Sequence, residues 1–315
     1  MRPRFLRHVL LFAASALLLC ACHGKDDGSP PGGSTPEAAL QRSIDLFKAG
    51  NFSALWKQAL PPANYATMRA DWSREQQRSP AISADDRAKF TAAMQQLTGK
   101  DAEKTLFNQW QPRLVRIEQQ YGDQLPVLIS VGGAFAKAQV KQNQNLSNTE
   151  KTVINNVVDT LAPWVQQAPW FDQAKARQAV NIVVAMARQL DLKSPEQLRT
   201  MDFDTTMGTY ATGFAGLKQL LAIYGLSVDD ALNSIKLTPA SNSNGHAVVR
   251  INYILLGKPL STESNLVEQD GRWYSKDMLD QVRASHQRLI QSTLRPTKNT
   301  TTAPGPAASS APGKV

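Results

Sequence analysis

The sequence predicts a mainly helical α+β protein, in which a long multi-helix region is followed by an antiparallel β-meander and a last helix. From about residue 36 to residue 235, apolar residues recur every three or four positions, which is the spacing of amphipathic helices. Between residues 248 and 255 the apolar residues alternate with others, as in a half-buried strand. With 42% hydrophobic and 19% charged residues, the composition is that of a folded chain.

The first helix is expected to begin at Pro36, because proline suits the first helical position and Thr35 can cap it. Leu40, Ile44 and Phe47 then fall on one face. Similar periodicity, bounded by capping residues, glycines and prolines, predicts helices over residues 52–59, 65–72, 83–97, 106–121, 127–140, 149–161, 172–190, 203–224 and 227–235, with another capped start at 194–197.

Proline and glycine mark special positions inside the helical region. Pro112 is expected to kink the helix or to restart it, since proline has no backbone N–H. The glycines at 132–133 and 208–216 match neither a dinucleotide-binding turn nor a phosphate-binding loop. Their expected role is therefore close packing between helices.

The C-terminal part predicts a meander, because short turns join consecutive strands. Gly257-Lys258-Pro259 is expected to form one turn, and Asp270-Gly271 is a strong hairpin pattern. The expected strands cover residues 235–238, 248–255, 261–268 and 272–274. A last helix is expected over residues 276–290, where the apolar positions again have helical spacing.

The first 21 residues have the pattern of an export signal. Met1 to Arg7 is short and cationic, and the uncharged run from Val9 to Ala21 is shorter than the ~20 residues that span a bilayer as a helix. The stretch that follows, 24–35, is polar and rich in glycine and proline. It is expected to be a flexible spacer.

Leu19-Cys20-Ala21-Cys22 resembles the lipobox of bacterial lipoproteins, with leucine three residues before the last cysteine and alanine directly before it. The resemblance implies that signal peptidase II cuts between Ala21 and Cys22 and that Cys22 carries the lipid. In lipoproteins of this kind an aspartate after the cysteine tends to retain the protein in the inner membrane, and here the residue is His23. The resemblance therefore implies an outer-membrane anchor with the body in the periplasm. The alternative is an ordinary secretory signal with a chance cysteine.

The predicted organisation is a lipoprotein signal peptide (1–21), a flexible tether (22–35), a folded body (36–291) and a disordered tail (292–315). Within the body, residues 36–235 are expected to be helical, and residues 236–291 are expected to form the β-meander and the last helix. The tail has almost no apolar bulk to offset the entropy of ordering it. Of the formal net charge of +9, three positive charges lie in the signal and three in the tail. A body so close to neutral predicts no nucleic-acid partner.

The two ends of the body resemble NTF2-like, cystatin-like domains. Residues 36–61 are similar to their opening helices, including the Ala-Gly-Asn-Phe turn, and residues 246–279 are similar to their closing strands. The chain departs from that pattern by carrying roughly 170 residues of mostly helical sequence between the two ends. Two interpretations stay open. The chain has a helical insertion in an NTF2-like core, or the similarity is a coincidence of the turn and capping residues that α+β chains share.

Few residues offer catalytic or metal-binding chemistry. The body contains no cysteine, and the four histidines of the chain do not share a metal-binding spacing, so neither a metal nor a cofactor is predicted. Asp202 and Asp204 are the most suggestive carboxylate pair, since such pairs can share a proton or bind metal. The simpler interpretation is that they favour the positive N-terminus of the helix after them.

These observations favour a non-catalytic, outer-membrane-anchored periplasmic lipoprotein that binds a protein partner or a small ligand. The tryptophans are expected in the core, although a few could line a groove for such a partner. One alternative is an inhibitor or immunity-type lipoprotein that acts against a toxin or a wall-degrading enzyme. Another is an envelope enzyme that uses Asp202 and Asp204.

Overall fold

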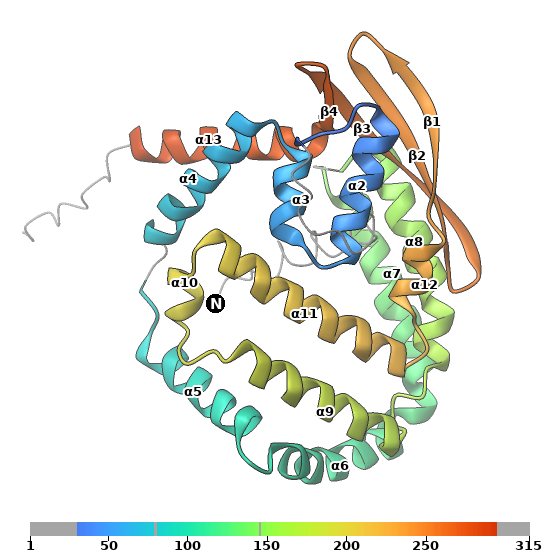
Figure 1. Ribbon diagram of the computed structural model, residues 1–315. Helices are drawn as coiled ribbons and strands as arrows, with labels where there is room; N and C mark the ends of the chain where they lie inside the picture. Colours follow the sequence, from blue (N-terminus) through green and yellow to red (C-terminus); the bar gives the residue numbers. More distant parts are fainter. Residues whose placement is uncertain (1–29, 79–80, 145, 295–315) are drawn as a thin grey trace, which may run out of the picture.

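The computed structural model describes residues 30–78, 81–144 and 146–294. In this part of the chain the predicted mainly helical α+β fold is confirmed: helices α2 to α12 come first, four strands follow, and α13 is last (Figure 1). The predicted signal peptide with its cleavage site at Ala21 and Cys22, and residues 295–315 of the predicted tail, lie outside the described residues.

The helices begin and end close to where capping residues predict. Thr35 caps α2, where its side chain accepts a hydrogen bond from the N–H of Ala38 at 3.2 Å. The helices are α2 (Pro36–Lys48), α3 (Phe52–Ala59), α4 (Pro62–Arg78), α5 (Ala84–Thr98), α6 (Ala102–Tyr121), the 3₁₀ turn η1 (Gly122–Gln124), α7 (Leu125–Gln142), α8 (Asn148–Gln167), α9 (Gln173–Leu190), α10 (Gln197–Thr200), α11 (Phe203–Ile223), α12 (Val228–Asn233) and α13 (Lys276–Leu294).

Several helices extend beyond their expected ends: α4 spans Pro62–Arg78 rather than 65–72, α6 begins at Ala102 rather than at residue 106, and α8 continues to Gln167 rather than ending at residue 161. Pro112 lies inside α6, so the helix does not restart there. The proline is exposed, and water can therefore hydrogen-bond to the carbonyl group that it leaves free. At the other end of the chain, α13 continues through the first three residues of the predicted disordered tail. Arg78 of α4 holds this end, because its guanidinium donates to the Ser292 hydroxyl at 2.6 Å.

The four strands form one antiparallel sheet in the order β1-β2-β3-β4. They are β1 (Lys236–Ser243), β2 (His246–Leu255), β3 (Lys258–Gln269) and β4 (Arg272–Ser275). Asp270 and Gly271 both have positive φ, as a tight hairpin turn requires. The expected turn at Gly257-Lys258-Pro259 is displaced, because Leu256 and Gly257 make it and Pro259 already pairs with Ile254. Proline is tolerated there because it is only the second residue of the strand.

One face of the sheet covers the main hydrophobic core. Along β2, alternate residues are buried, and they join a cluster with α2, α3 and α12. Ile251 on the strand and Ile44 on α2 are among the largest fully buried side chains. In Figure 1, α2 and α3 lie beside the sheet, and helices α5 and α6 lie at the opposite end of the molecule. We call α5 to α9 the helical arm.

The chain just before α2 is fixed to the body, so the predicted flexible tether ends earlier than residue 35. Gly33 forms an antiparallel bridge with Trp273 on β4. The Arg272 guanidinium donates to three successive backbone carbonyls, those of Pro30, Pro31 and Gly32. A side chain at residue 33 would lie 2.3 Å from the nearest backbone nitrogen, so glycine is needed for this close approach.

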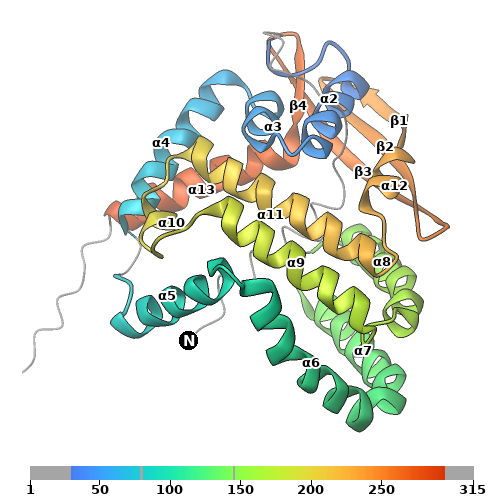
Figure 2. The same ribbon diagram turned by 60° about the horizontal axis from the view of Figure 1, so that its bottom comes forward.

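Within the arm, α9 packs against α5 and α6, and α7 packs against α8; α9 also packs against α11, which lies outside the arm (Figure 2). The glycine-rich segments behave differently from one another. A side chain at Gly216 would lie 2.6 Å from the sulfur of Met186, which confirms close packing of α11 on α9 at this position, whereas a side chain at Gly208 or Gly213 would meet nothing within 4 Å. A side chain at Gly132 or Gly133 would meet nothing within 4 Å, so close packing was a wrong expectation for α7.

Candidate functional site

An apolar groove of about 280 Å³ runs between α6 and α9 in the helical arm. Its lining residues are apolar, and two of them, Trp110 and Tyr224, also carry a polar atom. The lining consists of Leu97 from α5, Leu106, Phe107, Trp110 and Leu114 from α6, Ala176, Ala179, Val180 and Val183 from α9, and Tyr224 after α11. Neither a carboxylate nor a cationic side chain belongs to it.

The helix pattern explains why a groove forms here. Leu106, Trp110 and Leu114 are spaced four residues apart, so α6 presents them as one stripe. Opposite them, α9 presents the small side chains of Ala176 and Ala179, which do not fill the space between the two helices. Large residues on one helix and small residues on the other therefore leave an open apolar channel.

Polar contacts hold the two helices together along the groove. The Arg188 guanidinium of α9 forms an ion pair with the Glu103 carboxylate at the start of α6. Further along, the Gln111 amide donates to the Gln173 amide oxygen at 2.8 Å. The hydrogen bond from Arg188 lowers the pKa of Glu103, so the carboxylate stays ionised and paired at neutral pH. These contacts fix the spacing of α6 and α9.

Trp110 is the residue that most clearly marks the groove as a binding surface. Its side chain is 49% exposed, although tryptophan is mostly buried in folded proteins. The guanidinium of Arg113 lies over its ring, 5.3 Å from the centroid. A ligand in the groove would cover an aromatic surface that water now contacts. Trp110 therefore agrees with the second expectation for the tryptophans, that a few of them line a groove.

The apolar surface continues beyond the groove. Ile117 and Tyr121 extend the α6 stripe and are 43% and 40% exposed. On α7, no residue is buried, and Val131 and Phe135 are 63% and 64% exposed. Nevertheless, among the described residues no helix is both long and apolar enough to cross a membrane.

Asp202 and Asp204 have structural partners. Asp202 caps α11, where it accepts hydrogen bonds at 2.8 Å from both the N–H and the hydroxyl of Thr205. These bonds lower the pKa of Asp202. Asp204 accepts hydrogen bonds from Ser53 and from Arg69, which lower its pKa in that order of importance. Both carboxylates therefore favour the ionised form, whereas a general acid or a shared proton needs a raised pKa.

Replacing Asp204 with asparagine is expected to lower the free energy of unfolding by less than about 1 kcal/mol at neutral pH, because the ion pair with Arg69 is about half exposed. A lowered folded-state pKa stabilises the protein above the unfolded value of about 3.9, and the contribution is lost as the pH falls through the folded value. Urea unfolding at neutral and at acid pH should show the difference disappearing in acid. A folded variant with a severe envelope defect would instead favour the enzyme hypothesis.

A second ionisable pair joins α4 to α13 and was missed by the sequence analysis. The Nδ1 atom of His286 lies 2.6 Å from a carboxylate oxygen of Asp71, whose other oxygen accepts a hydrogen bond from Arg74 at 3.2 Å. Asp71 is buried. The sequence does contain one clue, since His286 has helical spacing with the buried Leu279 and Val282. Among the described residues no cluster of three or more His, Cys, Asp or Glu side chains could hold a metal ion.

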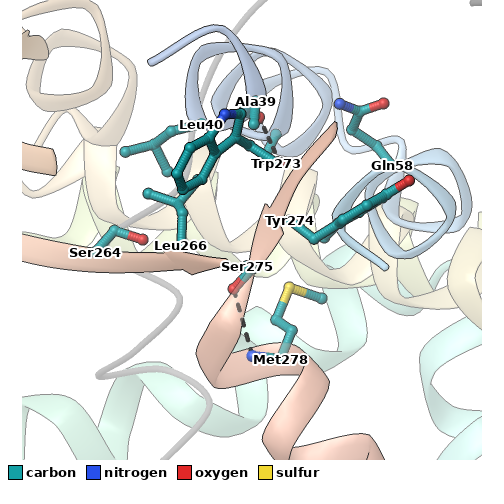
Figure 3. A pocket seen from close by; sticks show the side chains of 11 residues that line it. Ala39, Leu40, Gln58, Ser264, Leu266, Trp273, Tyr274, Ser275 and Met278 are labelled. Carbon is teal, nitrogen blue, oxygen red and sulfur yellow. Dashed lines mark hydrogen bonds between the residues drawn. The ribbon is translucent and has the colours of Figure 1, made fainter. Parts of the chain in front are cut away.

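A small cavity lies beneath Trp273 and Tyr274, between the sheet and helices α2 and α3 (Figure 3). Its volume is about 20 Å³, which is room for about one water molecule. Gln58 beside it donates from its amide to the backbone carbonyl of Gly32, and Ser43 donates to the carbonyl of Ala39. These polar side chains already have partners, so the cavity is a packing defect of the core rather than a ligand site.

Comparisons with known proteins add no relative, because no family model matches the chain and neither a curated protein nor a solved structure matches it significantly. The resemblances to lipoproteins and to NTF2-like domains therefore stay predictions. The groove between α6 and α9 is the candidate functional site that the geometry favours.

Proposed function

We propose that the protein is a non-catalytic lipoprotein, anchored in the outer membrane through Cys22, that binds an apolar ligand in the periplasm through the groove between α6 and α9. The groove itself carries this proposal. At about 280 Å³ it is close to the lower end of the usual range for small-molecule sites, and its lining is apolar with few polar atoms, as such sites have. Burial of apolar surface there contributes roughly 25 cal/mol for each Å² removed from water.

The ionisable groups support a binding role more than a catalytic one. Asp204 and Glu103 are ion-paired, and Asp202 is a helix cap. No carboxylate or histidine lines the groove, and the phenol of Tyr224 has a raised pKa because of its burial. A neutral apolar channel fits the hydrocarbon part of a ligand.

Replacing Ala179 with tryptophan is expected to abolish this binding, because the indole would fill the space that the small side chain leaves in the groove. The probe is 1-decanol, an uncharged alkyl chain, and its binding to the full chain in lipid nanodiscs is measured by calorimetry against empty nanodiscs. We expect at least a tenfold loss of affinity, about 1.4 kcal/mol.

The matched control is Ala185→Trp on the same helix, where the side chain is exposed and lines no described pocket. Both variants carry the same added bulk, and circular dichroism reports whether each is folded. The control should bind the probe like the unmodified protein. Equal binding by the two variants, or no binding by the unmodified protein, would contradict the proposed function.

A further inference from the structure

We infer that the groove takes an anionic single-chain amphiphile, with its hydrocarbon chain between α6 and α9 and its headgroup paired with Arg113. This inference rests on the proposed function and adds the chemical class of the ligand. The apolar lining selects a chain, and the charges beside the groove select the sign of the headgroup.

Arg113 is placed at the groove by its own ring contact. Its guanidinium lies over the indole of Trp110, which lines the groove and is half exposed. Among the described residues Arg113 has no carboxylate partner. Stacking on a ring leaves the N–H groups at the edge of the guanidinium free to donate, and a carboxylate or phosphate can accept two of them at once.

Two carboxylates near the groove accept hydrogen bonds from other groups. Glu103 pairs with Arg188 at one end, and Asp172 at the other end caps α9 by accepting from the N–H of Lys175 at 2.8 Å. A second guanidinium, that of Arg177, lies 4.0 Å from the centroid of the Phe107 ring, which also lines the groove. The guanidiniums of Arg113 and Arg177 thus have no carboxylate partner among the described residues, so a negative headgroup is attracted to them.

Three probes with the same chain separate the contributions of chain and headgroup: decanoate, decyl phosphate and 1-decanol. We expect the two anions to bind the full chain in nanodiscs about threefold to fivefold more tightly than 1-decanol, the size typical of an exposed ion pair. Decanoate represents a fatty acid and decyl phosphate represents a phospholipid fragment, so the tighter of the two identifies the source of the headgroup.

The variant Arg113→Gln should lose the preference for the anions and keep its affinity for 1-decanol. The matched control is Arg116→Gln, which removes the same charge from the same helix at an exposed residue outside the lining. It should keep the preference, and any binding of probes to the bilayer cancels between the two variants.

The outcomes distinguish this inference from the proposed function. If 1-decanol binds as tightly as the anions, or if Arg113→Gln keeps the preference, the headgroup inference is wrong and the groove proposal stands. If none of the three probes binds to the unmodified protein, the groove proposal fails and the inference fails with it. If Arg116→Gln loses the preference as Arg113→Gln does, general charge rather than the stacked guanidinium attracts the anion, and the inference is overturned.

Discussion

Replacing Ile251 with alanine is expected to lower the free energy of unfolding by about 2–5 kcal/mol, the range for truncating a large aliphatic side chain in a core. Ile251 is 2% exposed and belongs to the cluster that joins β2 to α2, α3 and α12. The substitution removes buried carbon and leaves a cavity that the neighbouring side chains fill only in part. Urea unfolding followed by far-ultraviolet circular dichroism measures the effect.

The matched control for this prediction is Ile254→Ala on the same strand. Ile254 is 51% exposed on the opposite face of β2, so its truncation should change the stability by no more than about 0.5 kcal/mol. The two variants share the residue type, the strand and the change in strand propensity. Equal effects from the two would mean that the buried face of the sheet is assigned wrongly.

The sheet and its buried face could be predicted from the sequence because a strand has only two faces. The alternation of apolar and other residues that ends at Leu255 predicts which side chains are buried, and Val249 and Ile251 are indeed in the core. Turn residues then set the order of the strands. Only local details differ, such as the start of β3 before Pro259, because a proline near a strand end is compatible with either assignment.

The groove could not be predicted, because helical periodicity does not say which neighbour an apolar stripe contacts. Leu106 and Trp110 belong to one stripe, yet the first is 7% exposed and the second 49%. The difference depends on the alanines of α9, which lie some 70 positions further along the chain. The open surface at Gly132 could not be predicted for the same reason. A glycine in a helix is compatible both with close packing against a neighbouring helix and with free space beside it.

The fixed segment before α2 also shows that amino-acid composition alone does not determine whether a segment is flexible. A stretch rich in glycine and proline usually indicates flexibility, and the sequence contains nothing nearby that would order it. The group that orders it is Arg272, about 240 residues away, together with the edge of β4. Local sequence patterns do not predict long-range contacts of this kind. The same is true of the pairing between Asp71 and His286.

Replacing Cys22 with serine is expected to abolish lipid attachment completely, because a hydroxyl cannot take the place of the thiol that the lipobox presents for acylation. Metabolic labelling with an alkyne analogue of palmitate, followed by detection on the purified protein, gives a yes-or-no result. Cys20→Ser is the matched control, since it makes the same change two residues earlier and should keep the label. Label lost in the control but kept in Cys22→Ser would move the anchor to Cys20, and no label in the unmodified protein would indicate an ordinary secretory signal.

The proposed anchor at Cys22 would also limit how the body can lie relative to the membrane. Eight peptide links separate Cys22 from Pro30, where Arg272 fixes the chain, so the two residues are at most about 28 Å apart. With that anchor the sheet end of the body would stay near the bilayer, whereas helices α5 and α6 lie at the opposite end of the molecule (Figure 1). The resemblance to lipoproteins implies three acyl chains, which would exceed the two hydrophobic signals that stable anchoring needs. Loss of the label in Cys22→Ser would thus support a body that is held at the membrane by its sheet end.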